Sequence, residues 1–342
     1  MIFATLFDSY YLDKGIVLYN SLEAVTKDFK LYIFCFDDRS KQILEDMKLE
    51  HAVIVHHSEF EDEALLKLKA ERSKAEYCWT CTPVIVDYVL KQYKEENCTY
   101  IDSDLYFFKD PQCLFDEIEE AKADVVITPH RFSDTGKDQK TQKRSGKYCV
   151  EFNYFNQTDN AWEALNWWRE RCAEWCFHLY EPERMGDQKY LEKFPVLFKG
   201  VHELQHLGGG VAPWNLKQYK LVSRVTENAD AGNESDSVSK AVRLAKKDTN
   251  EEFDLVFYHF QNLRYISEHV INISSGSHDK KIKKAIYPVY LNQIYEVRKM
   301  LSDKYDVSFD VKKKYSSNKL IAWLQGGLLR FKIKSLSDIY RI

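Results

Sequence analysis

Short apolar segments alternate with helical segments along the first half of this 342-residue chain. The apolar segments have the length and the β-branched and aromatic content of strands. They cover residues 2–7, 31–36, 52–56, 100–108 and 124–129. The segments between them suit helices, at residues 16–24, 41–47 and from Thr82-Pro83, a pair typical of helix starts, to about residue 96. Because strands joined through helices pair in parallel, we predict an α/β fold with a doubly wound, mainly parallel sheet flanked by helices.

The second half of the chain follows another pattern. Residues 159–177 have apolar side chains at helical spacing and predict a long helix. Residues 227–252 are polar and predict a loop, and residues 253–260 predict a last strand. We therefore expect one α/β domain over residues 1–265 and a mainly helical extension over residues 266–342.

The composition and the start of the chain favour a cytoplasmic protein. No apolar run approaches the ~18 residues of a membrane-spanning helix, and the first residues have neither a basic start nor a cleavage site. The eight cysteines are scattered through expected strands and helices, as reduced core thiols are. Zinc binding by Cys78 and Cys81, or by Cys172 and Cys176, is less favoured because these pairs lack flanking turn glycines.

Charge is distributed unevenly along the chain. The net charge is −4, but from Val311 onward eight basic residues stand against one acidic residue. The tail therefore carries +7 and residues 1–310 carry −11. Apolar residues recur in the tail at helical spacing, at Leu320, Leu324, Leu328 and Phe331. This pattern suits either peripheral membrane contact through residues 312–342 or a helix docked on the body. The acidic body, without a basic recognition module, argues against nucleic acid as a partner.

Asp102 and Asp104 follow an apolar strand and form the chain's one Asp-x-Asp pair. Residues two apart in an extended chain point to the same side, so both carboxylates can converge on one hard cation such as Mn²⁺ or Mg²⁺. The carboxyl end of a parallel strand is also where α/β sheets bind ligands. A metal held there suits a nucleotide-diphosphate substrate, because the metal stabilises the departing diphosphate. Chance is the alternative, but unpaired acids buried at a strand end are costly without a cation.

Tyr100-Ile101-Asp102-Ser103-Asp104-Leu105 resembles the Asp-x-Asp strand of GT-A glycosyltransferases. The segment from Thr5 to Tyr11 is similar to the first strand and loop of family eight, which includes glycogenin and bacterial galactosyl- and glucosyltransferases. The resemblance implies a GT-A fold over residues 1–265, with the metal on Asp102 and Asp104. It also implies Asp8 and Tyr10 or Tyr11 around the nucleoside base, with Thr5 and Ser103 in the same donor site.

Two later motifs extend this resemblance. Tyr258-His259-Phe260 resembles the signature whose histidine completes the metal shell, so His259 is the expected third ligand. The family has a diphosphate-binding lysine six residues later; here Arg264 lies five later and is the candidate for that contact. Gly186-Asp187-Gln188 resembles a helix start that faces the donor sugar, where Asp187 and Gln188 would stabilise an oxocarbenium-like state in a retaining transfer. Helix capping by Asp187 is the structural alternative.

Other segments, among them His130-Arg131-Phe132 and Ala212-Pro213-Trp214-Asn215, resemble a bacterial family of nucleotide-sugar transferases of surface-polysaccharide synthesis. This likeness places His130 in the donor site. Gly209, within a run of three glycines, either offers its amide to a phosphate or an acceptor hydroxyl, or forms a turn. One departure from that family affects the predictions of the donor sugar and of activity. Cys149-Val150-Glu151 stands where that family has Asn-x-Gly.

Together these features predict a metal-dependent glycosyltransferase. It would move a sugar from a nucleotide-diphosphate donor, with UDP-sugar favoured, to a glycan or lipid-linked saccharide. A phosphatase of the haloacid-dehalogenase type also uses Asp-x-Asp after a strand, but it has Thr or Val where this chain has Leu105. A non-catalytic relative that binds nucleotide or glycan is the second alternative, and Cys149 and Glu151 motivate it.

Overall fold

A seven-stranded sheet forms the centre of the molecule, in the order β3-β2-β1-β4-β7-β6-β8. The computed structural model describes residues 1–224, 241–267, 270–273, 280–309 and 339–341. The strands of the sheet are β1 (Ile2–Phe7), β2 (Lys30–Cys35), β3 (Ala52–His56), β4 (Asn97–Ile101), β6 (Val125–Pro129), β7 (Tyr148–Asn156) and β8 (Val201–Glu203). Strand β7 is antiparallel to β4 and β6, and the other pairs in this sheet are parallel. The predicted mixed, mainly parallel α/β architecture is confirmed.

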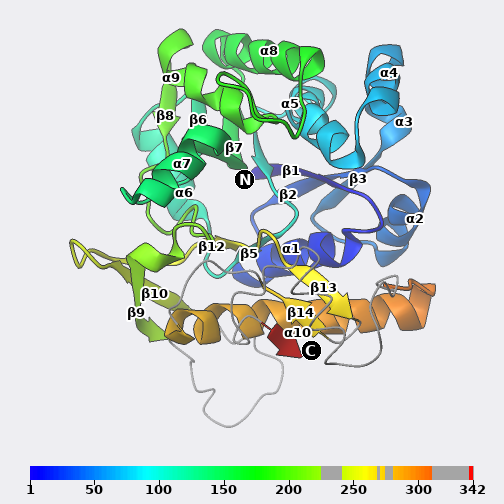
Figure 1. Ribbon diagram of the computed structural model, residues 1–342. Coiled ribbons are helices and arrows are strands. Elements are labelled where there is room, and N and C mark those ends of the chain that lie inside the picture. Colours follow the sequence, from blue (N-terminus) through cyan, green and yellow to red (C-terminus); the bar gives the residue numbers. More distant parts are fainter. Residues whose placement is uncertain (225–240, 268–269, 274–279, 310–338, 342) are drawn as a thin grey trace.

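Helices cover both faces of this sheet (Figure 1). One layer consists of α3 (His57–Phe60), α4 (Glu63–Glu71), α5 (Lys74–Gln92), α8 (Asp159–Glu174), the 3₁₀ helix η1 (Gln188–Lys193) and α9 (Phe194–Leu197). The opposite layer consists of α1 (Leu12–Val25), α2 (Asp38–Met47), α6 (Gln112–Glu120) and α10 (Lys280–Tyr305). Strand β1 shows why two cores form. Phe3 and Phe7 pack into one core and Ala4 and Leu6 into the other, as the alternation of a strand requires.

The predicted strand over residues 100–108 is wrong as a single element. Strand β4 ends at Ile101, and β5 (Leu105–Phe107) leaves the sheet to pair antiparallel with β12 (Phe257–His259). The chain turns sharply at Asp102, whose carbonyl accepts a hydrogen bond from the amide of Leu105. The amide of Asp102 still donates to the carbonyl of Glu151 in β7, and the turn that follows places Asp102 and Asp104 at the end of the strand.

The region after η2 (Leu216–Gln218) also differs from the prediction. The loop predicted over 227–252 contains β10 (Val242–Lys246), which pairs with β9 (Tyr219–Arg224) and β11 (Glu252–Asp254). The single strand predicted over 253–260 is divided between β11 and β12, which lie in different sheets. Residues 225–240 lie outside the described residues.

Helix α5 begins earlier than its predicted start at Thr82-Pro83. Ser73 caps it: its side chain accepts from the amide of Glu76, and the Glu76 carboxylate accepts from the amide of Ser73. This reciprocal pair satisfies two helix-end donors. Pro83 lies inside the helix, where its missing N–H removes one rung without ending it.

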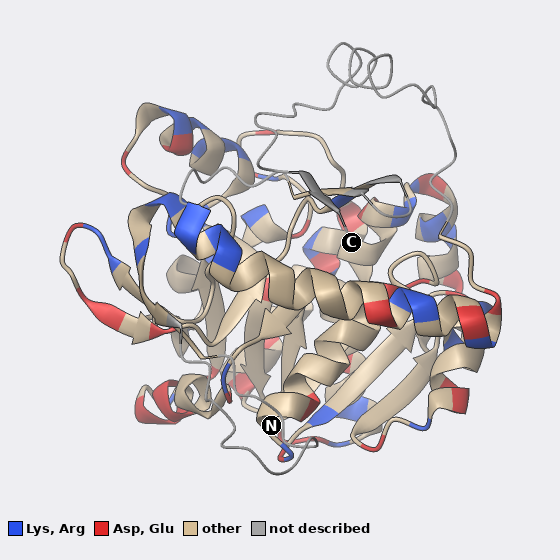
Figure 2. Ribbon diagram, turned by 90° about the horizontal axis from the view of Figure 1, so that it is seen from below, with Lys and Arg blue, Asp and Glu red and all other residues tan. Residues whose placement is uncertain are grey.

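The last described helix, α10, packs against α1 and shares its core. Lysines gather at the N-terminal end of α10 (Figure 2). The C-terminal segment is not only helical, because β14 (Val270–Asn272) pairs with β13 (Arg264–Ser267) and with β15 (Ile339–Arg341). The helix predicted in the basic tail lies outside the described residues. Among the helices that are described, none is long and apolar enough to cross a membrane.

Candidate active site

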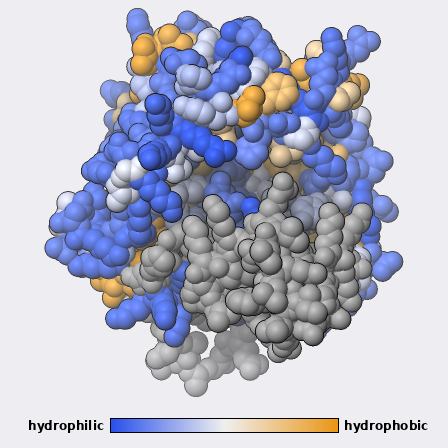
Figure 3. Space-filling view, in the orientation of Figure 1, coloured by the Kyte–Doolittle hydropathy of each residue, from blue (hydrophilic) through white to orange (hydrophobic). Residues whose placement is uncertain are grey.

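A cavity of about 1460 Å³ opens where β1, β4 and β6 end and β7 begins. Figure 3 shows this face hollowed at its centre, with hydrophilic side chains inside the hollow. The cavity lies at the carboxyl ends of the parallel strands, where ligand sites of α/β folds are found. Most of the predicted site residues line it: Asp8, Tyr10, Tyr11, Asp102, Ser103, Asp104, His130, Asp187, Gln188, His259 and Arg264.

Two carboxylates and one imidazole converge on the floor of this cavity. Asp102 and Asp104 stand at the break between β4 and β5, and His259 ends β12. Nε2 of His259 lies 3.0 Å from Oδ1 of Asp104 and 3.5 Å from Oδ2 of Asp102. The three side chains come together because β5 and β12 pair, with His259 opposite Leu105. Residues more than 150 positions apart in the sequence thus form one potential ligand set.

A fourth residue, Glu151, stands behind the imidazole. It is fully buried in β7, and its Oε2 lies 2.7 Å from Nδ1 of His259. A carboxylate on Nδ1 fixes the ring and leaves Nε2 directed toward the two aspartates, as in metal sites whose histidine is held by an outer carboxylate. Glu151 does not line the cavity, although Cys149 does. From the sequence, Glu151 is only a departure from the family's Asn-x-Gly pattern. A charged residue in an apolar strand nevertheless indicates a buried partner for its charge.

The members of this cluster shift one another's pKa values. Burial and the neighbouring Asp104 raise the pKa of Asp102 to about 8, although His259 acts in the opposite direction. Burial alone would lower the pKa of His259, but the Asp104 carboxylate raises it well above the usual range. For Asp104 itself, burial is outweighed by His259 and Lys14, so its pKa is lowered. The imidazole therefore holds a proton where a cation would also satisfy the carboxylates.

The donor set fits a divalent cation. Two carboxylates and a neutral imidazole suit Mn²⁺, which accepts nitrogen beside oxygen ligands, and the carboxylates alone suit Mg²⁺. Asp102 and Asp104 remain partly exposed to the cavity, with 28% and 17% of their side-chain surface accessible. A ligand on the cavity side can therefore reach a cation held by them. Asp102, Asp104 and His259 would hold it, with Glu151 orienting the histidine.

One end of the cavity is built by the loop after β1. Lys74 of α5 lies 3.3 Å from the carboxylate of Asp8, and Tyr10 is 72% exposed. The ammonium of Lys14 lies 4.1 Å from the centre of the Tyr11 ring, a cation–π contact that fixes the tyrosine. Gly15 permits this arrangement, because a Cβ there would meet the ring of Phe7 at 2.2 Å. An exposed tyrosine beside a fixed one gives flat surfaces suited to a nucleoside base.

Asp187 and Gln188 lie deeper in the cavity, just before and at the start of η1. The carbonyl of Asp187 accepts from the indole N–H of Trp168, and the side-chain amide of Gln188 donates through Nε2 to the carbonyl of Ser145. Burial raises the pKa of the Asp187 carboxyl to about 7. The side chain of Asp187 makes no capping hydrogen bond to η1, so the capping alternative is not what the structure shows.

His130 forms part of the cavity wall, where it packs against other aromatic rings. Its ring stacks on Phe132 at 4.8 Å and meets Trp214 edge-on at 5.1 Å. Burial lowers its pKa to about 3, so the imidazole is neutral. The carbonyl of His130 accepts from the side chains of Trp214 and Asn215. Both belong to Ala212-Pro213-Trp214-Asn215, a segment that carries the family resemblance.

The structure does not bring Thr5 and Gly209 to the cavity. Thr5 lies on the same face of β1 as Phe3 and Phe7, and its side chain is fully buried on that face. The carbonyl of Gly209 accepts from Arg131, and a Cβ at Gly209 would press against Leu204 at 2.9 Å. At Gly209 the structure therefore supports close packing in a turn, one of the two alternatives expected from the sequence.

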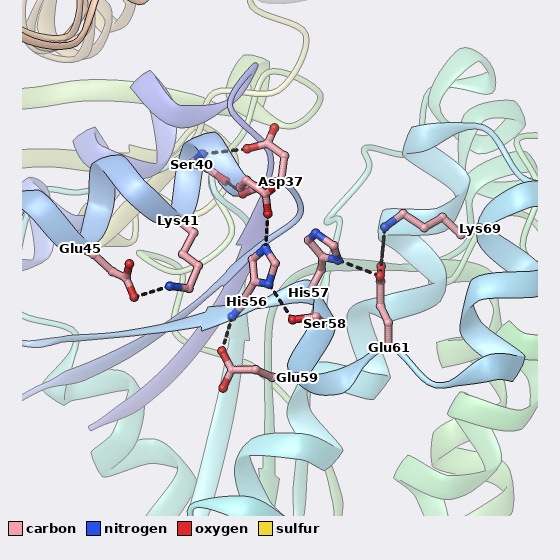
Figure 4. Close-up of polar contacts among 11 residues, drawn as sticks. Asp37, Ser40, Lys41, Glu45, His56, His57, Ser58, Glu59, Glu61 and Lys69 are labelled. Atoms are coloured by element: carbon pink, nitrogen blue, oxygen red, sulfur yellow. Dashed lines mark hydrogen bonds and ion pairs between the residues drawn. The ribbon is translucent and has the colours of Figure 1, made fainter.

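A second group of histidines and acids lies away from the cavity, between α2 and α3. Nε2 of His56 lies 2.8 Å from Asp38 and its Nδ1 lies 2.7 Å from Ser58. Figure 4 shows the neighbouring His57 directed at Glu61, which also receives Lys69. Both nitrogens of His56 are thus paired within the protein, and the group links two elements of the fold.

No protein-family model matches the chain. The chain is 31% identical to the uncharacterised protein YfnD of Bacillus subtilis (strain 168), over 84% of this chain and 87% of YfnD. It is 30% identical to YfnF of the same organism, over 78% of this chain and 82% of YfnF.

Among solved structures, two similar folds are glycosyltransferases. The galactosyltransferase LgtC, in complex with donor and acceptor sugar analogues, is 12% identical, with 86% of this chain and 96% of that chain covered and a TM-score of 0.47. Mouse xyloside xylosyltransferase 1 is 13% identical, with 77% and 98% covered and a TM-score of 0.43. The likeness concerns the fold alone.

Proposed function

The chain belongs to the family of the Bacillus subtilis proteins YfnD and YfnF, and from its cavity we propose that it is a metal-dependent glycosyltransferase of the GT-A type. The convergence of Asp102, Asp104 and His259 on the floor of a large cavity carries this proposal. Behind the imidazole, the buried carboxylate of Glu151 orients this third ligand. A non-catalytic relative that binds a nucleotide sugar through a metal would share these side chains, so turnover of the donor separates it from an enzyme.

The donor is a nucleotide-diphosphate sugar, with UDP-sugar favoured. A divalent cation, Mn²⁺ or Mg²⁺, supplies charge that stabilises a departing diphosphate. Tyr10, Tyr11 and Asp8 hold the nucleoside at the end of β1, and Ser103 and Arg264 lie toward the phosphates. All five line the same cavity.

The sugar lies beside Asp187 and Gln188, and transfer proceeds with retention. Positive charge develops on the sugar as the bond to the diphosphate breaks, and a carboxylate or amide oxygen beside it lowers the barrier. Asp187 and Gln188 line the cavity near the start of β7, next to the strand that ends at the metal ligands. His130 closes the wall with a neutral ring that adds no competing charge.

The acceptor is a glycan or a lipid-linked saccharide, and the sugar moved is a hexose. The +7 charge of the tail from Val311 onward suits contact with an anionic membrane surface, which would bring a lipid-linked acceptor to the enzyme. Vesicle sedimentation of the full chain with and without anionic lipid tests this part. Equal binding to neutral and anionic vesicles would argue against it.

A thermal-shift panel tests the metal-dependent donor binding that this function requires. The full chain is melted with UDP-, GDP-, CMP- and dTDP-sugars, with Mn²⁺ or with excess EDTA. We expect UDP-sugars to raise the melting temperature with Mn²⁺ alone, because ligand binding stabilises the folded state. Asp104→Asn should lose the shift. Asp159→Asn, at an exposed position that begins α8, is the matched control and should keep it. An undiminished shift in EDTA or in Asp104→Asn would overturn the proposal.

A further inference from the structure

One wall of the cavity carries a row of cations on α7 (Gly136–Ser145). Lys137, Lys140 and Arg144 are spaced three and four residues apart, which places them on one face of the helix, and all three line the cavity. Within the described part of the chain, no carboxylate pairs with any of them. The helix's own acid, Asp138, is engaged elsewhere, at 2.7 Å from Lys217. This wall therefore presents positive charge without a counter-ion among the described residues.

The row lies on the far side of the metal ligands from the nucleoside loop. In the sheet, β1 flanks β4 on one side, and β7 and then β6 follow on the other. Helix α7 follows β6, two strands beyond the end of β4. At the usual spacing of ~4.8 Å between strands, that is roughly 10 Å. A donor that spans from Tyr10 and Tyr11 to the aspartates would thus have its phosphates at the metal site. Helix α7 would lie farther along the cavity than these phosphates.

Helix α7 borders the place where the sugar would change hands. The side-chain amide of Gln188 donates to the carbonyl of Ser145, the last residue of α7. Phe132, which precedes the helix, lines the cavity and is backed by the stacked ring of His130. An aromatic face beside several cations suits a saccharide that carries negative groups, because pockets combine a flat apolar surface with a few charged groups that fix orientation.

Resting on the proposed glycosyl transfer, we infer that the acceptor is an anionic saccharide, bearing carboxylate or phosphate groups, that binds against α7 through Lys137, Lys140 and Arg144. The metal ligands and the α7 cations act on different substrates. The floor of the cavity neutralises the donor's diphosphate through a cation, and the α7 wall neutralises the acceptor. A neutral glycan would leave three unpaired cations in the cavity wall.

Binding in excess EDTA tests this inference, because the metal site then cannot hold an anion. Three probes of equal length are titrated into the full chain at low salt: tetragalacturonate for carboxylate, phosphorylated maltotetraose for phosphate and maltotetraose as the neutral reference. Exposed ion pairs each contribute modestly, so we expect at least one anionic probe to bind about tenfold more tightly than maltotetraose. The preference should decline as salt rises.

The variants decide whether α7 is responsible. K137Q/K140Q/R144Q should bind all three probes alike. K143Q removes a charge from the same helix at a position that does not line the cavity, and it should keep the preference. Equal binding of the three probes by the wild type, or an unchanged preference in the triple variant, would overturn the inference. Mn²⁺-dependent binding of UDP by the wild type, measured in parallel, tests the proposed function separately.

Discussion

Glu151 is a buried carboxylate with two different oxygens. Oε2 accepts from His259, whereas Oε1 has no partner among the described residues. A buried ion with one unpaired oxygen is costly, so this position is stable only if the pairing with the imidazole is strong. That pairing sets which nitrogen of His259 faces the aspartates. The residue thereby acts on the metal site without touching the cavity.

Replacement of Glu151 by Gln should weaken metal binding. The amide keeps the shape but removes the charge that orients His259 and makes it a better ligand, so we expect the affinity for Mn²⁺ to fall 10–100-fold. Isothermal titration of Mn²⁺ measures this. Glu203→Gln is the matched control, since Glu203 is paired with Lys147 and Tyr148 outside the cavity. An unchanged Kd in Glu151→Gln would contradict the assigned role.

Asp187 should make stability depend on pH. Burial raises its pKa from 3.8 to about 7, so the folded state holds its proton while the unfolded state has lost it. Stability from this group is therefore present at low pH and is lost as pH rises from about 4 through 7, by about 4 kcal/mol at most. Asp187→Asn mimics the protonated form. Its melting temperature relative to wild type should rise by several degrees between pH 5 and pH 8, and a constant difference would refute the burial argument.

Single residues were predicted where a local pattern carries the chemistry. The Asp102 and Asp104 pair follows from strand periodicity, and both residues reach the cavity. Thr5 and Gly209 do not line the cavity. Motif membership does not say which face of a strand a residue occupies or what a glycine packs against. Lys137, Lys140 and Arg144 were missed because a charge run on a polar helix has no local signal that distinguishes a cavity wall from a solvated face.

Among the elements, the link between α4 and α8 shows how a helix end is secured. Arg72 follows α4 directly, and its guanidinium donates to the carbonyls of Cys172 and Ala173 at 2.8 and 2.6 Å. These carbonyls belong to the last turn of α8, where they lack helical partners. A cation there also complements the negative end of the helix. One buried side chain thus joins the end of α4 to the end of α8.

Arg72→Ala should destabilise the protein by roughly 3 kcal/mol, because it leaves two buried carbonyls without donors. The free energy of unfolding from urea titration measures this. Arg171→Ala is the control from the same region. That side chain is partly exposed and pairs with Glu174, so its loss should cost less than ~1 kcal/mol. Equal losses in the two variants would show that Arg72 contributes no more than a surface pair.

The predicted elements were right where periodicity is long and local. The strands β1, β2, β3 and β6 and the helices α1, α2 and α8 fall where the pattern placed them, within a few residues. The start of α5 was wrong because Thr82-Pro83 imitates a cap, while Ser73 and Glu76 form the real one. The break after Ile101 was missed because Leu105–Phe107 remain apolar, and their partner β12 lies some 150 residues away.

Contacts between the N-terminal half and the segment from residue 265 onward hold the molecule together. The hydroxyl of Tyr265 donates to Asp13 at 2.5 Å, and Arg39 donates to the carbonyl of Asp306 at 2.7 Å. Helix α10 covers α1, so the segment after residue 265 completes the core of the N-terminal half. Sequence patterns cannot reveal such pairing, because it depends on side chains about 250 positions apart.

We propose that a cation at Asp102, Asp104 and His259 makes a sugar donor reactive in this cavity. The most direct measurement is the rate at which the full chain releases UDP from a UDP-sugar, first with Mn²⁺, then with excess EDTA, then with Mn²⁺ restored. We expect release to stop in EDTA and to return with Mn²⁺. A full rate in excess EDTA would contradict the claim.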